Sequence, residues 1–145
     1  MWVRPMTPAD ADALADLVAT VPGSVDPGHE LARPAARAWV ACDAGSDVPL
    51  AYLVCSSVLD EVELLALGTR PEARLRGLAR ALLRQVIAFA AESRARRVCL
   101  EVGANNGAAR RLYESAGFVV FNVRRAYYQK TGEDALEMEL TLAAP

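Results

Sequence analysis

Residues 62–83 read VELLALGTRPEARLRGLARALL, and this stretch decides the expected fold. Its first part, residues 62–67, is an apolar run of the length of a β-strand. Gly68 and Pro71 then mark a turn, and from Leu78 onward the apolar positions recur at helical spacing. The stretch therefore predicts a strand, a turn and a helix, in that order.

The turn before the predicted helix has the features of an anion site. The first backbone amides of a helix lack intrahelical partners and point outward with the positive end of the helix dipole. Gly77 and Ala79 are small enough to let a diphosphate approach the backbone closely. Three arginines would add positive charge: Arg74, Arg76 and Arg80. An ordinary helix N-terminus is equally compatible, because arginines spaced four residues apart also form a solvated helix face.

Composition places the chain among small globular proteins. With 145 residues, 53% of them hydrophobic, we expect one domain over residues 1–145 with a core of its own. A net charge of −2 provides no global basic field for nucleic acid or an anionic membrane. No apolar run has the length of a signal peptide or a membrane span, so we expect a cytoplasmic protein.

The residues most often found in metal sites are sparse. The cysteines are odd in number, are not paired at metal-site spacing, and lie inside apolar runs: Cys42, Cys55 and Cys99. We interpret them as small buried hydrophobic residues. His29, the only histidine, is expected at the surface. The sequence gives no reason to expect a metal.

The rest of the chain alternates between strands and helices. Further strands are expected at residues 2–4, 38–42, 50–59, 98–102, 118–123 and 135–142. Helices are expected after the cap at Thr7, ending at Pro22 and Gly23, and at residues 78–93 and 108–115. Residues 25–38 are compatible with a short helix and a mobile loop, and residues 124–134 with a long loop. The order predicts an α/β fold with a central mixed, mostly antiparallel sheet and helices on both faces.

The element order and four motifs resemble the GNAT superfamily of acyl-CoA-dependent N-acetyltransferases over nearly the whole chain. The motifs are RLRGLA (residues 74–79), LEV (100–102) followed by Asn105 and Asn106, ARRLYESAGF (109–118) and YYQKTGEDALEM (127–138). The last motif, with VLDEVELLAL (58–67), is most similar to the bacterial enzymes that acetylate the N-terminal alanine of a small-subunit ribosomal protein. The resemblance implies the GNAT fold, acetyl-CoA as cosubstrate, and the N-terminal peptide of a protein as acceptor.

Site residues follow from the same resemblance. It implies that the backbone of the fourth strand binds the pantetheine arm, that the following turn binds the pyrophosphate, and that an asparagine at the next strand's exit contacts the cofactor. The corresponding residues are Leu67, Gly68 and Thr69, then Leu75, Arg76, Gly77, Leu78, Ala79 and Arg80, and Asn106. Leu75 departs from the family, which usually has a polar residue there, and Gly103 replaces a common arginine.

The resemblance also implies catalytic residues, and two tyrosines of the expected loop are candidates for binding the acceptor. Glu101 matches the general base and Tyr113 the general acid that protonates the departing thiolate. A solvent-facing glutamate and an aromatic core residue are the structural alternatives. Tyr127 and Tyr128 are expected to wall the peptide slot or to pack within their loop.

Two other functions are compatible with these residues. A GNAT enzyme acting on a lysine side chain, a polyamine or an antibiotic would need the same chemistry. A non-catalytic acyl-CoA-binding module would need only the anion site in the turn before the helix. The presence of both Glu101 and Tyr113 argues against such a module.

Overall fold

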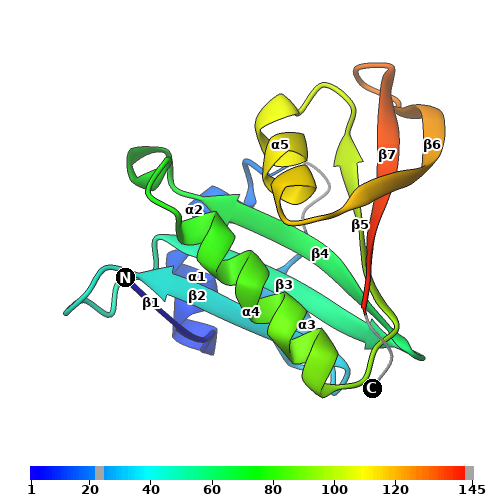
Figure 1. Ribbon diagram of the computed structural model, residues 1–145. Helices are drawn as coiled ribbons and strands as arrows, with labels where there is room; N and C mark the ends of the chain where they lie inside the picture. The colour runs from blue at the N-terminus through cyan, green and yellow to red at the C-terminus, as the bar shows by residue number, and fades with distance from the viewer. Residues whose placement is uncertain (22–24, 143–145) are drawn as a thin grey trace.

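The computed structural model describes residues 1–21 and 25–142, which form one seven-stranded sheet flanked by helices (Figure 1). The strands are β1 (Trp2–Pro5), β2 (Ala36–Cys42), β3 (Ala51–Val58), β4 (Glu61–Thr69), β5 (Arg97–Gly103), β6 (Val119–Tyr128) and β7 (Glu133–Thr141). The helices are α1 (Pro8–Ala13), α2 (Ala15–Val18), α3 (Pro27–Leu31), α4 (Leu78–Glu92) and α5 (Gly107–Ser115), with a 3-10 turn η1 (Pro71–Ala73).

The two faces of the sheet carry separate apolar layers. On one face, α4 packs through side chains such as Leu82 against Leu53 of β3 and Leu100 of β5. On the other face, Leu17 of α2 packs against a cluster that includes Val40 of β2. Figure 1 shows α4 crossing one face, with α1 behind the sheet. Both layers exclude water from apolar side chains, which is the main force that holds such a sheet to its helices.

The junction between β4 and β5 is a seam at which few residues of the two strands pair. The strand order of the sheet is β1-β2-β3-β4-β5-β7-β6, and β4 and β5 are its parallel pair. Their register covers three residue pairs and ends at Glu63 and Cys99, although β4 continues beside β3 to Thr69 and β5 beside β7 to Gly103. The two strands therefore diverge, as Figure 1 shows, and leave unpaired backbone on both sides of the opening.

Strand β4 has a bulge just after the opening begins. Val54 is opposite Ala66 whereas Cys55 is opposite Leu64, so Leu65 has no register partner on β3. A bulge of this kind bends a strand and increases its local twist. It lies next to the point where β4 leaves β5.

Most of the predicted architecture is confirmed. The mixed, mostly antiparallel sheet has helices on both faces, and β2, β3 and β4 form the expected antiparallel series. A short helix occupies Pro27–Leu31, capped by the Asp26 side chain. The first predicted helix is interrupted at Leu14, so that α1 and α2 are separate. Its predicted end at Pro22 and Gly23 lies outside the described residues.

The prediction of a long loop over residues 124–134 is wrong. Strand β6 extends to Tyr128, and residues 129–132 make a turn into β7. The register shifts between Arg124 and Tyr128, and Ala126 adopts a positive φ of 49°. Because β6 is an irregular edge strand whose side chains are nearly all exposed, apolar ones included, its sequence lacks the alternation that marks a half-buried strand.

Candidate active site

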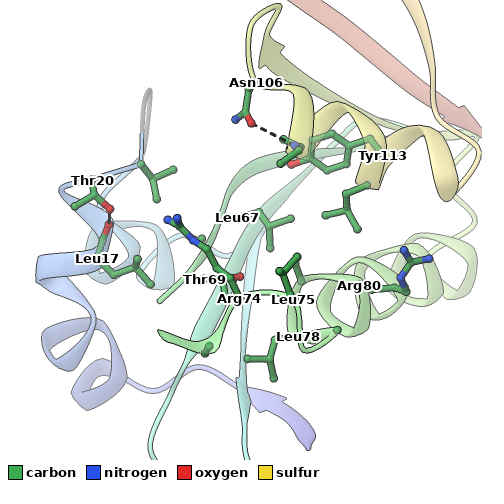
Figure 2. A pocket seen from close by; sticks show the side chains of 18 residues that line it. Leu17, Thr20, Leu67, Thr69, Arg74, Leu75, Leu78, Arg80, Asn106 and Tyr113 are labelled. Atoms are coloured by element: carbon green, nitrogen blue, oxygen red, sulfur yellow. Dashed lines mark hydrogen bonds between the residues drawn. The ribbon is translucent and has the colours of Figure 1, made fainter. Parts of the chain in front are cut away.

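The main cleft, with a volume of about 620 Å³, lies between the C-terminal end of β4, the start of α4, α5 and the end of α2. Its lining includes Leu17, Thr20, Val21, Leu67, Gly68, Thr69, Ala73, Arg74, Leu75, Gly77, Leu78, Ala79, Arg80, Asn106, Ala108, Ala109, Leu112 and Tyr113. In Figure 2, Asn106 and Tyr113 lie on one side of the cleft and Leu17 and Thr20 on the other. The structure thus gathers most of the predicted cofactor residues around one cavity.

The N-terminus of α4 contributes free backbone donors to this cleft. Gly77 is the N-cap residue in the left-handed conformation, with φ 82°, and no side chain caps the helix. The first bond of the α4 ladder runs from the Ala81 amide to the Gly77 carbonyl at 3.0 Å. The amides of Leu78 to Arg80 come before this first bond. They therefore have no carbonyl partner within the helix and are available to an anion.

Arginine side chains divide between the cleft and the surface. Arg74 and Arg80 line the cleft and have no ion-pair partner among the described residues. Arg76 is absent from the lining and pairs instead with Asp43 in the turn after β2. Leu75 adopts a positive φ of 63° and its side chain is fully exposed. Two of the three predicted arginines are therefore placed to act on a bound anion.

The end of β4 forms a wall without side-chain bulk. A Cβ atom on Gly68 would lie 2.8 Å from the Tyr52 ring and 2.9 Å from a methyl group of Val21. Both distances are shorter than a carbon–carbon contact, so only glycine lets Val21 and the buried Tyr52 approach the strand this closely. Leu67 and Thr69 line the cleft on either side of this glycine.

Helix α5 supplies Asn106 and Tyr113. The Asn106 side-chain oxygen accepts a hydrogen bond from the Ala109 amide at 3.2 Å and so caps the helix (Figure 2). Tyr113 is buried, with 6% of its surface exposed, and its ring packs against Phe118 at 5.8 Å between centroids. Burial raises the pKa of the Tyr113 phenol to about 12. The hydroxyl therefore keeps its proton throughout the physiological pH range.

Glu101 and the tyrosine pair lie outside the main cleft. Glu101 is exposed on β5, two residues beyond the last register partner of β4, at Cys99. The Tyr128 hydroxyl donates a hydrogen bond to Glu101 Oε1 at 3.3 Å. Burial, with the negative charge of Glu101, raises the pKa of Tyr128 to about 12. The Tyr127 ring meets Tyr128 edge-on at 5.4 Å between centroids.

Strand geometry places Glu101 and Tyr113 on opposite faces of the sheet. Leu100 and Val102 belong to the apolar layer on the α4 face, as does Tyr113. Because side chains alternate along a strand, Glu101 points to the other face. The opening between β4 and β5 begins after Cys99, so it lies beside Glu101 and connects the two faces.

Sequence reasoning missed two contributions to the site. The end of α2 and the residues after it wall the cleft with Leu17, Thr20 and Val21, whereas the sequence predicted only a helix in this segment. Glu133 accepts a hydrogen bond from the Asn105 amide at 2.6 Å, a contact that joins the β6–β7 turn to the β5–α5 loop. Gly103, noted in the sequence as a replacement of a common arginine, lies beside this carboxylate.

The part of the chain that the structure describes offers neither a metal cluster nor a membrane-spanning helix. No group of three or more histidine, cysteine, aspartate or glutamate side chains in residues 1–21 and 25–142 is arranged to hold a metal ion. Over the same residues, every helix is too short or too polar to cross a membrane.

The chain matches a known protein family and has relatives of known activity. Residues 10–118 match the model of the Acetyltransferase (GNAT) family. The chain is 36% identical over 141 residues to the N-alpha-acetyltransferase RimI of Mycobacterium tuberculosis, covering 92% of this chain and 87% of that protein. It is 39% identical over 95 residues to the [ribosomal protein bS18]-alanine N-acetyltransferase of Escherichia coli strain K12, and this match spans 64% of each chain.

Solved structures agree with the sequence relatives. The ribosomal-protein-S18-alanine N-acetyltransferase from Escherichia coli superposes with a TM-score of 0.85 at 28% identity, covering 99% of this chain and 95% of that one. NAA60 of Arabidopsis thaliana, solved with a bisubstrate analogue, superposes with a TM-score of 0.88 at 20% identity, over 99% of each chain, and shares the fold. The resemblance seen in the sequence motifs is confirmed, and the chain belongs to the Acetyltransferase (GNAT) family.

Proposed function

We propose that this protein is an acetyl-CoA-dependent N-alpha-acetyltransferase whose acceptor is the N-terminal alanine of a ribosomal protein. The observation that carries the proposal is the cleft at the parting of β4 and β5, which joins an uncapped helix N-terminus to a buried, protonated tyrosine. The names of the relatives from Escherichia coli and Mycobacterium tuberculosis support the choice of an N-terminal amine.

The residues that line the cleft fit acetyl-CoA. The amides of the first turn of α4 would bind the diphosphate, with Arg74 and Arg80 adding charge. The free backbone of β4 from Leu67 to Thr69 would hydrogen-bond the amide groups of the pantetheine arm. Asn106 still has its NH₂ group to donate, because its oxygen caps α5. The cosubstrate supplies an activated acetyl group as a thioester.

An N-terminal amine suits a site of this kind. Acyl transfer requires the neutral amine, because only its nitrogen lone pair can attack the thioester carbonyl carbon. With a pKa near 8, roughly a tenth of an α-amine is neutral at pH 7, whereas well under about one lysine side chain in a thousand is neutral. Less assistance from a base is therefore needed for an N-terminus than for a lysine.

Glu101 is proposed as the base that removes the proton from the attacking amine, either directly or through a water molecule. It lies on the face opposite α4, beside the opening between β4 and β5, and Tyr128 holds one of its carboxylate oxygens. Tyr127 and Tyr128 would form the wall of the acceptor slot next to it. The acceptor peptide would then approach from this face and the thioester from the α4 face.

Tyr113 is proposed as the acid that assists departure of the thiolate when the carbon–sulfur bond breaks. Its pKa of about 12 guarantees the protonated form, but it also means that the phenol is a weaker acid than a thiol of pKa about 8.5. Tyr113 therefore helps by sharing its proton with the developing negative charge on sulfur through a hydrogen bond.

The acceptor class is tested by mass spectrometry on a set of synthetic peptides that differ only in their first residue. With acetyl-CoA, we expect one acetyl group on the N-terminal amine and the highest kcat/KM for alanine. A peptide with a blocked N-terminus and one internal lysine is the control. Acetylation of that lysine at a comparable rate would favour a different amine, and acetyl-CoA binding without any transfer would favour a non-catalytic module.

The proposed diphosphate site at the start of α4 is tested by two alanine substitutions at glycines of positive φ. Gly77→Ala and Gly45→Ala each force a side chain into the left-handed region, at 82° and 76°, which costs about 1–2 kcal/mol. Only Gly77 borders the main cleft. Calorimetry is expected to show acetyl-CoA binding at least about tenfold weaker for Gly77→Ala, which corresponds to about 1.4 kcal/mol, and unchanged for Gly45→Ala. Equal affinities of the two variants for acetyl-CoA would contradict a diphosphate site at Gly77.

The role of Tyr113 is tested by Tyr113→Phe, which keeps the ring against Phe118 and removes the hydroxyl. We expect kcat to fall by about 10²-fold, the lower end of what a general acid contributes, with little change in KM for either substrate. Ser115→Ala, which removes an exposed hydroxyl from the same helix outside the cleft, is the control. An unchanged kcat for Tyr113→Phe would remove this residue from the chemistry.

A further inference from the structure

Glu133 forms a bridge between two loops that carry different parts of the proposed site. It is the first residue of β7, and its Oε2 atom accepts a hydrogen bond from the Asn105 amide at 2.6 Å. Asn105 precedes Asn106, which caps α5 and lines the main cleft. Glu133 is also the register partner of Tyr128, whose hydroxyl holds Glu101. The carboxylate thus joins the cosubstrate side to the acceptor side.

The space for this carboxylate exists because residue 103 is glycine. A Cβ atom on Gly103 would lie 2.6 and 2.7 Å from the two carboxylate oxygens of Glu133 and 2.8 Å from its Cδ. The carboxylate therefore lies directly over β5, where any larger residue would place its side chain. Since it is the far end of a flexible side chain, it would move aside and lose the Asn105 amide.

Asp134, the next residue, makes two further hydrogen bonds, one of which crosses the same junction. The Ala104 amide donates to the Asp134 backbone oxygen at 2.9 Å, and the Ala126 amide donates to Asp134 Oδ1 at 2.7 Å. The first contact holds the start of the β5–α5 loop against the β6–β7 hairpin, and the second joins β6 to β7 within the hairpin. They do not reach Asn105, so the Glu133 carboxylate provides the link to the residue next to Asn106.

We propose that Glu133 is a positioning residue, which sets the β5–α5 loop relative to the β6–β7 hairpin so that thioester and acceptor amine meet at the required distance. The proposal rests on the proposed function. Displacements of about 1 Å remote from the reacting atoms are enough to slow a reaction by roughly 10²-fold. A charge-assisted hydrogen bond of 2.6 Å at this junction limits such movement.

A different role for Glu133 makes different predictions. As an electrostatic attractor of cationic peptides, the residue would act through its charge and would be unaffected by the neighbour at position 103. As a positioning residue, it acts through its hydrogen-bond acceptor and requires the space above Gly103.

The experiment uses the full chain with Glu133→Ala, Glu133→Gln, Gly103→Ala and the double variant Gly103→Ala/Glu133→Ala. Glu92→Ala, which removes an exposed carboxylate at the end of α4, is the control. The readouts are kcat and KM for acetyl-CoA and for an alanine-first peptide, together with hydrogen exchange of the Asn105 amide without substrates.

We expect Glu133→Ala and Gly103→Ala each to lower kcat/KM for the peptide by about tenfold, a fraction of the loss that misplacement can cause, and to speed exchange of the Asn105 amide. The double variant is expected to be no worse than Glu133→Ala alone, because both changes remove the same contact. Glu133→Gln keeps an acceptor oxygen and should stay within about twofold of the wild type in kcat/KM.

Two results would overturn the proposal. Additive losses in the double variant would show that Gly103 and Glu133 act independently, and a loss for Glu133→Gln equal to that for Glu133→Ala would show that charge alone matters. Failure of the proposed function is distinguished by the wild type, which would then acetylate none of the peptides. In that case exchange of the Asn105 amide in the same variants still decides whether the bridge holds the loop.

Discussion

The parting of β4 from β5 is the constraint on which the site depends. Three register pairs join the strands, and beyond Glu63 and Cys99 each follows its other neighbour. Unpaired backbone donors and acceptors in a protein interior need partners, so a seam of this kind requires either water or a ligand with amide groups of its own. The start of α4, without a side-chain cap, adds further free donors at the same place. A sheet paired along its full length would have no such opening.

The two faces of the sheet give the reacting groups opposite environments. Tyr113 is enclosed in the apolar layer that α4 and α5 form, and burial keeps its proton in place. Glu101 points to the other face of β5, is itself exposed to solvent, and is held by Tyr128. The proposed reaction needs a base that the acceptor can reach and an acid that is shielded beside the leaving group. The sheet separates these two groups, because they lie on opposite faces of it. Glu133 would fix the β5–α5 loop relative to the β6–β7 hairpin and so keep the two sides of the site aligned.

Local sequence signals predicted the parts of the site that local geometry determines. Gly77 before an apolar helical pattern indicated the uncapped helix start, and the motif around Tyr113 indicated α5. Other features depend on contacts between distant segments, and no single stretch of sequence encodes them. Arg76 was expected beside the anion, but Asp43 holds it away from the cleft. The extension of β6, the wall formed by α2 and the fit of Glu133 over Gly103 likewise arise only when the chain is folded.

The most direct measurement is a crystal structure of the protein with coenzyme A. We expect the diphosphate at the amides of Leu78 to Arg80, the pantetheine arm along β4 beside Leu67 and Thr69, and the sulfur near the Tyr113 hydroxyl, at the opening that leads to Glu101. Coenzyme A bound at another surface, with the seam between β4 and β5 filled only by water, would contradict the central claim that this parting of strands creates the site.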